Sequence, residues 1–176
     1  PLVQQKAVDL ARRNAKPVIV ATQMLESLMS ATRPTRAEVS DVANAVLDRA
    51  DALMLSGETS IGDHPILTTS TMSRIIETIE SETLTTLRPA QAAPRTKGGA
   101  IARAAAEVGD NLDARYIVAF TTTGDTARRL ARYRTPVPLL AFTPDEHVRN
   151  QLSLTWGVET FLVPSVEHTD QMVMQV

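Results

Sequence analysis

Residues 16–27 read KPVIVATQMLES, and residues 51–59 read DALMLSGET. Each stretch contains a short apolar run, at 18–21 and 52–55, that ends in hydroxyl, glycine or carboxylate residues. Such a run is typical of a strand buried on both faces of a parallel sheet. Between the runs, Thr35 and Glu38 have the spacing of a capping box, which predicts a helix start. The resulting order α-β-α-β-α over residues 2–82 predicts a parallel α/β sheet.

The composition changes in residues 84–98, where Thr, Pro, Ala and Arg dominate without a visible period. We interpret this segment as a linker between a first domain at 1–83 and a second at 99–176. Beyond the linker, helical and strand-like patterns alternate again, with strands expected at 116–120, 138–142 and 158–163. This pattern predicts a small open α/β domain with three layers.

Composition excludes several classes of protein. The chain has 176 residues, a formal net charge of −2 and no cysteine. A charge near zero leaves no footprint for nucleic acid, and no apolar run approaches the roughly 20 residues that a membrane helix needs. Without cysteine there is no disulfide, thiolate zinc site or cysteine nucleophile, and the three histidines stand alone, so we expect no metal site. The first residue is Pro1, and we expect a segment of a longer protein.

The strand ends supply the first candidate site. Active sites of parallel α/β proteins form where strands end and loops begin. Thr22 follows the first run, while Ser56 and Glu58 follow the second. Thr22 and Ser56 offer hydroxyls, which can bind a carboxylate or phosphate or take part in a proton relay, and Glu58 offers a carboxylate. The alternative is that these residues only form turns and helix caps, which use the same residue types.

A second candidate is the loop at 121–126, which follows a strand and opens a helix. Helix starts present free N–H groups and a partial positive charge that favour phosphate. Asp125 weakens this interpretation because its carboxylate can cap the helix and repel a phosphate; the alternative is a capped helix with a solvated arginine face. The residues proposed to bind a sugar phosphate are Thr121, Thr122, Thr123, Gly124 and Thr126.

Three stretches resemble signatures of the pyruvate kinase family, in the family's order. They are residues 16–27, residues 33–48 (RPTRAEVSDVANAVLD) and residues 52–59 (ALMLSGET). The second half is similar, more loosely, to the family's C-terminal allosteric domain, in an actinobacterial style. The resemblance implies the last units of a (β/α)8 TIM barrel followed by that domain.

The resemblance also implies an activity: transfer of the phosphoryl group of phosphoenolpyruvate to ADP, giving pyruvate and ATP, with Mg2+ and K+. It implies a cytoplasmic homotetramer regulated by a sugar phosphate or AMP. Thr22 matches the threonine beside the substrate carboxylate, and Ser56 and Glu58 match residues of the same cavity. Arg36 and Asp41 match subunit-interface positions. The family's catalytic lysine and metal ligands lie on earlier strands, so we expect the present chain alone to be inactive.

A second hypothesis is a non-catalytic regulatory module that binds a phosphorylated metabolite through residues 95–176. Three residues depart from the family pattern. Arg49 stands where glycine is common, which predicts a strained loop. Ile61 replaces a lysine that some members use toward the nucleotide. Asp125 stands where animal and yeast enzymes carry a positive or neutral residue, so fructose 1,6-bisphosphate is not carried over as the activator.

Overall fold

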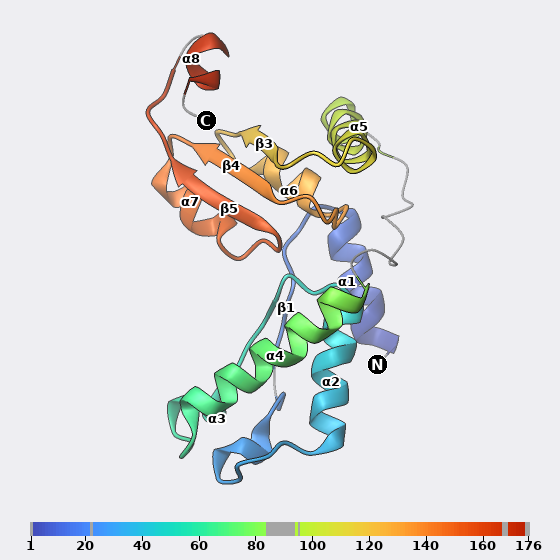
Figure 1. The fold of residues 1–176 in the computed structure, drawn as a ribbon, viewed down its shortest axis with the longest axis vertical. Helices are drawn as coiled ribbons and strands as arrows, with labels where there is room; N and C mark the ends of the chain where they lie inside the picture. The colour runs from blue at the N-terminus through green and yellow to red at the C-terminus, as the bar shows by residue number, and fades with distance from the viewer. Residues whose placement is uncertain (1, 22, 84–93, 95, 167–168, 175–176) are drawn as a thin grey trace. The chain divides into compact units, whose positions relative to one another are not determined.

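The computed structural model describes residues 2–21, 23–83, 94, 96–166 and 169–174 of the chain. These residues form two compact units (Figure 1). Unit 1 comprises residues 1–11 and 18–87, and unit 2 comprises residues 12–17 and 88–176. Most of the predicted linker lies outside the described residues, so the domain bounds 1–83, 84–98 and 99–176 stay a prediction.

Unit 1 contains a two-stranded parallel sheet with helices between and after its strands. Its register pairs Ile19 with Ala52 and Val20 with Leu53. The expected α-β-α-β-α order is confirmed, although the strands are shorter than the apolar runs and residues 57–60 form a one-turn helix. The elements are α1 (Leu2–Arg13), β1 (Ile19–Val20), the 3-10 helix η1 (Glu26–Met29), α2 (Arg36–Leu47), β2 (Ala52–Leu53), α3 (Gly57–Ser60) and α4 (Pro65–Thr83).

Both ends of α2 have well-defined caps. At its start, the Thr35 hydroxyl accepts a hydrogen bond from the Glu38 N–H, and the Glu38 carboxylate accepts one from the Thr35 N–H. This capping box confirms the predicted helix start. At its end, the Arg49 N–H donates to the Val46 carbonyl and the Ala50 N–H donates to the Ala45 carbonyl. These two bonds form a Schellman motif with Arg49 in the position that glycine usually occupies.

Arg49 has a φ of +69°, in the left-handed region. A side chain there brings Cβ close to the following carbonyl, at a cost of about 1–2 kcal/mol. The strain expected from arginine at a glycine position is therefore confirmed, and the helix end explains why the position calls for glycine.

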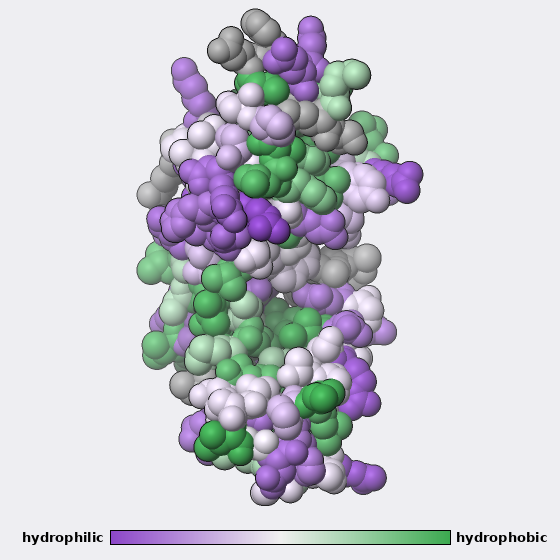
Figure 2. All heavy atoms as spheres, turned by 90° about the vertical axis from the view of Figure 1, so that its left-hand side faces the viewer, coloured by the Kyte–Doolittle hydropathy of each residue, from purple (hydrophilic) through white to green (hydrophobic). Residues whose placement is uncertain are grey.

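The core of unit 1 joins the two strands to α2 and α4. Leu25 and Leu28, which follow β1, are fully buried and anchor η1 to this core. On the face that carries α3 and α4, exposed apolar side chains lie between polar ones; Ile61 and Ile66 are among the exposed residues of unit 1 (Figure 2). The buried core residues are Val8, Val20, Met24, Leu25, Leu28, Val42, Ala45, Ala50 and Met72.

Unit 2 contains a three-stranded parallel sheet in the order β3-β4-β5. Successive parallel strands are joined by helices, as the sequence pattern predicted. The elements are α5 (Lys97–Asn111), β3 (Ile117–Phe120), α6 (Asp125–Ala131), β4 (Leu139–Thr143), α7 (Glu146–Leu152), β5 (Val158–Leu162) and α8 (Thr169–Val173). Among the described residues, no helix is both long and apolar enough to cross a membrane.

The two faces of this sheet differ. One face, with Ile117, Leu139 and Ala141, packs with α5, α6 and α7 in the buried clusters of unit 2. The opposite face carries a row of three stacked rings. The ring centroid of Phe142 lies 5.3 Å from that of Phe120 and 5.0 Å from that of Phe161. The described residues thus supply two of the three layers expected for this domain.

Candidate functional site

The carboxyl ends of β1 and β2 lie side by side in unit 1. The strands are parallel and in register, and the Met54 N–H extends their pairing by donating to the Val20 carbonyl at 2.9 Å. The loop after β1 and the turn after β2 therefore leave the sheet at the same edge. This is the edge at which parallel α/β proteins place their ligand sites.

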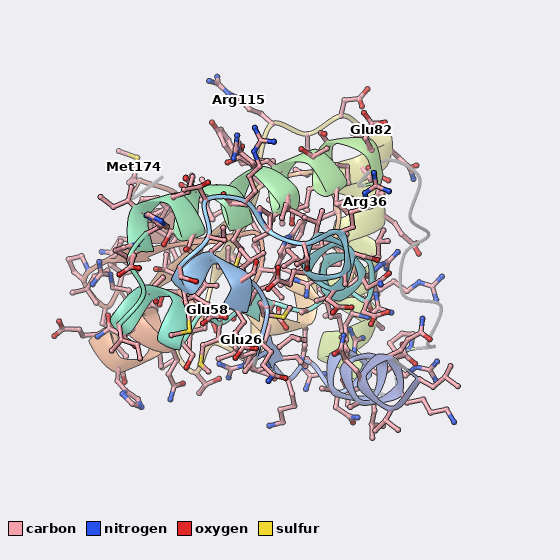
Figure 3. The ribbon with its side chains drawn as sticks, turned by 90° about the horizontal axis from the view of Figure 1, so that it is seen from below. Glu26, Arg36, Glu58, Glu82, Arg115 and Met174 are labelled. Atoms are coloured by element: carbon pink, nitrogen blue, oxygen red, sulfur yellow. The ribbon has the colours of Figure 1, made fainter. Side chains whose placement is uncertain are left out.

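Glu58 joins these two segments. Its residue is only 3% exposed, and its carboxylate accepts hydrogen bonds from the Ser56 N–H at 2.7 Å and the Leu25 N–H at 3.4 Å. One partner follows β2 and the other follows β1, so the carboxylate holds the two strand ends together. In Figure 3, Glu58 is seen near Glu26 of η1.

The charge of Glu58 is stabilised by backbone amides. Burial by itself raises the pKa of the Glu58 carboxyl, but hydrogen bonds from backbone N–H groups outweigh burial and hold the pKa below its ordinary value. The carboxylate is therefore ionised at neutral pH and directed at the main chain. The amides that stabilise it belong to Glu58, Ser56, Leu25 and Met24.

Ser56 presents a different chemistry from Glu58. The residue is exposed, and its side chain makes no capping hydrogen bond to α3, although it occupies the N-cap position. A serine at an N-cap ordinarily accepts a bond from the first turn. The Ser56 hydroxyl is thus not used as a cap and is available to a ligand at the strand end.

Thr22, the third predicted site residue, lies outside the described residues. The structure therefore places Ser56 and Glu58 together, and the meeting of all three stays a prediction. Gln23, the next residue, has a φ of +50°. This left-handed conformation is unusual for a residue other than glycine, and such strain is concentrated at functional sites.

One residue of this region was missed by the sequence analysis as part of the site. Glu38 was predicted only as a helix cap, but its carboxylate also accepts from the N–H and the hydroxyl of Ser27, at 2.7 Å and 2.5 Å. The sequence offered no signal for this pair, because the two residues are eleven positions apart and joined by an irregular loop.

Arg36 and Asp41 are both exposed on α2. In Figure 3, Arg36 is seen away from Glu58. Exposure is compatible with the subunit-interface role expected for these residues, which stays a prediction.

The second candidate site is the loop between β3 and α6. Thr121 is buried, and its hydroxyl accepts a hydrogen bond from the Gly124 N–H at 2.9 Å. Gly124 has a φ of +79°, and a Cβ there would approach the Arg128 guanidinium within 2.7 Å. The left-handed φ favours glycine at this turn, whereas the flexible end of Arg128 could move away from a Cβ. Thr122 and Thr123 are exposed.

The charged residues of this loop pair with one another. Asp125 forms an ion pair with Arg129 at 2.6 Å, and Arg129 also donates to the Thr96 hydroxyl. Arg128 donates to the Thr123 carbonyl. Thr126 is exposed on the first turn of α6. Binding of a phosphate would have to compete with these internal contacts of the arginines, and effector binding stays a prediction.

Comparison with known proteins gives two matches to family models. The model described as "Pyruvate kinase, barrel domain" matches residues 1–69, and the model described as "Pyruvate kinase, alpha/beta domain" matches residues 99–176. Together they account for most of the chain and leave residues 70–98 between them unmatched.

Individual relatives agree with these models. A pyruvate kinase of Mycobacterium tuberculosis is 61% identical over 176 residues, which is 100% of this chain and 37% of the relative. One from Corynebacterium efficiens is 57% identical over 180 aligned positions, covering 100% of this chain and 37% of the relative. A crystal structure of a pyruvate kinase from Cryptosporidium parvum has a TM-score of 0.88 and 35% identity, covering 99% of this chain and 36% of that one. The present chain spans just over a third of the length of these relatives.

Proposed function

The chain belongs to the pyruvate kinase family, and from that premise we propose that it forms part of an enzyme that transfers the phosphoryl group of phosphoenolpyruvate to ADP. The products are pyruvate and ATP. In this proposal unit 1 supplies one side of the phosphoenolpyruvate site and unit 2 is a regulatory domain.

The observation that carries the proposal is the junction at the carboxyl ends of β1 and β2. Thr22 follows one strand in sequence and Ser56 follows the other, while Glu58 bonds to the main chain of both segments. A site at this edge fits phosphoryl transfer, which depends mainly on positioning the substrate and neutralising its charge.

The three residues have distinct proposed roles. Thr22 binds the carboxylate of phosphoenolpyruvate. The exposed Ser56 hydroxyl takes part in proton delivery to the enolate, because a hydroxyl can both donate and accept. Glu58 lines the same site, and its bonds to the Ser56 and Leu25 amides hold the strand ends that carry the other two residues.

The resemblance to the family implies Mg2+ and K+, with ligands on segments of the enzyme outside this chain. Among the described residues, no group of three or more His, Asp or Glu side chains could hold a metal ion. The oxygens of Glu58 are engaged by backbone amides. The location of the metal ligands rests on the resemblance and stays a prediction, and no step through the metals is derived from the present residues.

Regulation and assembly are further parts of the proposal. A sugar phosphate or AMP would bind unit 2, with the sugar phosphate at the loop of Thr121 to Thr126. The enzyme would be a cytoplasmic homotetramer in which Arg36 and Asp41 of α2 lie at a subunit interface. Exposure of Arg36, Asp41 and several threonines of the loop supports these assignments.

Kinetics of the complete enzyme that contains this chain test the proposal. Thr22→Ala should lower kcat/KM for phosphoenolpyruvate by about 100-fold, since a precisely placed donor is lost. Thr69→Ala, an exposed threonine of α4 in the same unit, is the matched control and should retain the wild-type turnover. The present chain alone should show no turnover in a coupled pyruvate assay. A wild-type enzyme without pyruvate formation from phosphoenolpyruvate and ADP would refute the function.

A further inference from the structure

The Glu38 carboxylate makes more contacts than a helix cap requires. Its Oε2 accepts from the Thr35 N–H at 2.7 Å and the Thr35 hydroxyl at 2.8 Å, which belong to the capping box. The same Oε2 accepts from the Ser27 hydroxyl at 2.5 Å, and Oε1 accepts from the Ser27 N–H at 2.7 Å. Both oxygens therefore hold η1, while one of them also holds the start of α2.

A glutamine could cap α2 alone, but only a glutamate has the second oxygen that accepts from the Ser27 N–H of η1. Glutamine serves a capping box as well as glutamate does, because one side-chain oxygen suffices. Glutamine has a single oxygen, and its amide N–H groups cannot accept from the Ser27 N–H. Hydrogen bonds from Ser27 and Thr35 outweigh the effect of burial and lower the pKa of Glu38, so both oxygens are acceptors at neutral pH.

The segment that Glu38 holds is fixed at three points. The Leu25 N–H donates to Glu58, the Ser27 N–H and hydroxyl donate to Glu38, and the Met29 carbonyl accepts from the Asp63 N–H at 2.8 Å. Leu25 itself is fully buried. Leu25, Ser27 and Met29 are thus each held from outside the segment, and the Ser27 bonds to Glu38 join the segment to α2.

The segment directly follows Thr22, the residue proposed to bind the substrate. Residues 23–29 follow Thr22 directly, with Gln23 in the left-handed region and only Met24 between it and the first fixed amide, that of Leu25. A substrate-binding group displaced by about 1 Å loses on the order of a hundredfold in rate. The bonds from Glu38 and Glu58 hold the segment that directly follows Thr22 in the sequence.

We propose that Glu38 is a positioning residue of the phosphoenolpyruvate site. It acts through Ser27 to hold residues 23–29, which follow Thr22 in the sequence. This inference rests on the proposed function and adds to it a residue of α2 that does not touch the substrate. Glu38 and Glu58 hold the same segment from two different helices: Glu38 belongs to α2 and Glu58 to α3.

Three variants separate positioning from helix capping. Glu38→Gln leaves a single side-chain oxygen, which cannot accept from both the Thr35 N–H of the capping box and the Ser27 N–H. Ser27→Ala removes only the hydroxyl bond and leaves α2 unchanged. Thr35→Ala removes the cap hydroxyl but leaves the bonds between Ser27 and Glu38 in place. All three are measured in the complete enzyme that contains this chain, with separate KM values for phosphoenolpyruvate and ADP.

Positioning predicts a selective effect on one substrate. Glu38→Gln should raise the KM for phosphoenolpyruvate about tenfold, the factor that about 1.4 kcal/mol produces, and Ser27→Ala about threefold. The KM for ADP should stay within about twofold in both. Thr35→Ala should lower the melting temperature as a lost cap does, yet leave both KM values near those of the wild type.

Two results would overturn the inference. One is an active wild type in which Glu38→Gln and Ser27→Ala leave the KM for phosphoenolpyruvate unchanged. The other is a loss of selectivity: in Glu38→Gln the KM for ADP rises as much as the KM for phosphoenolpyruvate, or Thr35→Ala raises the KM for phosphoenolpyruvate equally. Glu38 would then be only a helix cap. If Glu38→Gln does not fold, Ser27→Ala decides. A complete wild-type enzyme without turnover would instead refute the proposed function, and this result is distinct from the two that overturn the inference about Glu38.

Discussion

Replacing Glu58 by glutamine tests the central contact of unit 1. Glu58 is only 3% exposed, and its carboxylate accepts hydrogen bonds from the backbone amides of Ser56 and Leu25. Glutamine keeps one oxygen, so one of these amides faces an N–H group and loses its acceptor. Water cannot replace the acceptor readily at this depth. Glu58→Gln should therefore destabilise the junction of β1 and β2 strongly.

The magnitude follows from the lost bonds. A buried amide without a partner costs about 1–3 kcal/mol, and the remaining bond loses the strength that the charge gives it. The sum is about 2–4 kcal/mol. Since about 1.4 kcal/mol corresponds to a factor of ten, the amide protons of Leu25 and Ser56 should exchange with solvent roughly 30 to 1,000 times faster in Glu58→Gln.

Amide hydrogen exchange measured residue by residue gives this quantity directly. Glu26→Gln is the matched control because Glu26 is exposed on η1 and the substitution removes the same charge. A surface change of this kind should alter stability by less than about 0.5 kcal/mol. Exchange at Leu25 and Ser56 that is equally fast in wild type and Glu58→Gln, or equally accelerated by Glu26→Gln, would show that the carboxylate does not hold the strand ends.

Three further predictions concern other parts of the chain. Arg49→Gly should have a free energy of unfolding about 1 kcal/mol higher than Arg49→Ala, measured by urea denaturation, because only glycine removes the left-handed strain while both variants lack the side chain. Stability of unit 1 should be complete above the ordinary glutamate pKa of 4.5 and fall as the pH drops below it, since the folded state lowers the pKa of both Glu38 and Glu58 and so binds protons less readily than the unfolded chain. Asp125→Ala should tighten binding of a sugar phosphate about fivefold by calorimetry, because it removes a negative charge worth about 1 kcal/mol at 4 Å and releases Arg129 from its ion pair.

Each of these predictions has a clear contrary result. Equal stability of the glycine and alanine variants at position 49 would mean that the Schellman turn carries no strain. Acid stability unchanged between pH 5 and pH 3 would contradict the lowered pKa values. Unchanged or weaker binding in Asp125→Ala would remove the 121–126 loop as the site of the phosphate.

The candidate residues could be selected from the sequence, but their arrangement could be predicted only in part. Thr22, Ser56 and Glu58 could be selected because strand ends of parallel sheets are recognisable from apolar runs. The use of Glu58 could not be predicted, since a carboxylate after a strand can face a ligand or the main chain. The structure directs its oxygens at the amides of Ser56 and Leu25, which is the turn chemistry that the sequence left open as an alternative.

The sequence by itself determined the alternation of helices and strands, the start of α2 at Thr35 and the membership of a family, because these depend on short-range patterns of residues. Only the tertiary structure decided that Glu38 reaches Ser27 and that Glu58 joins two strand ends. Such contacts bring together residues separated by eleven or more positions, and their geometry depends on loops whose conformation no local pattern encodes. The helix end at Arg49 combines both levels: the departure from glycine is visible in the sequence, and the left-handed turn that makes it costly is visible only in the fold.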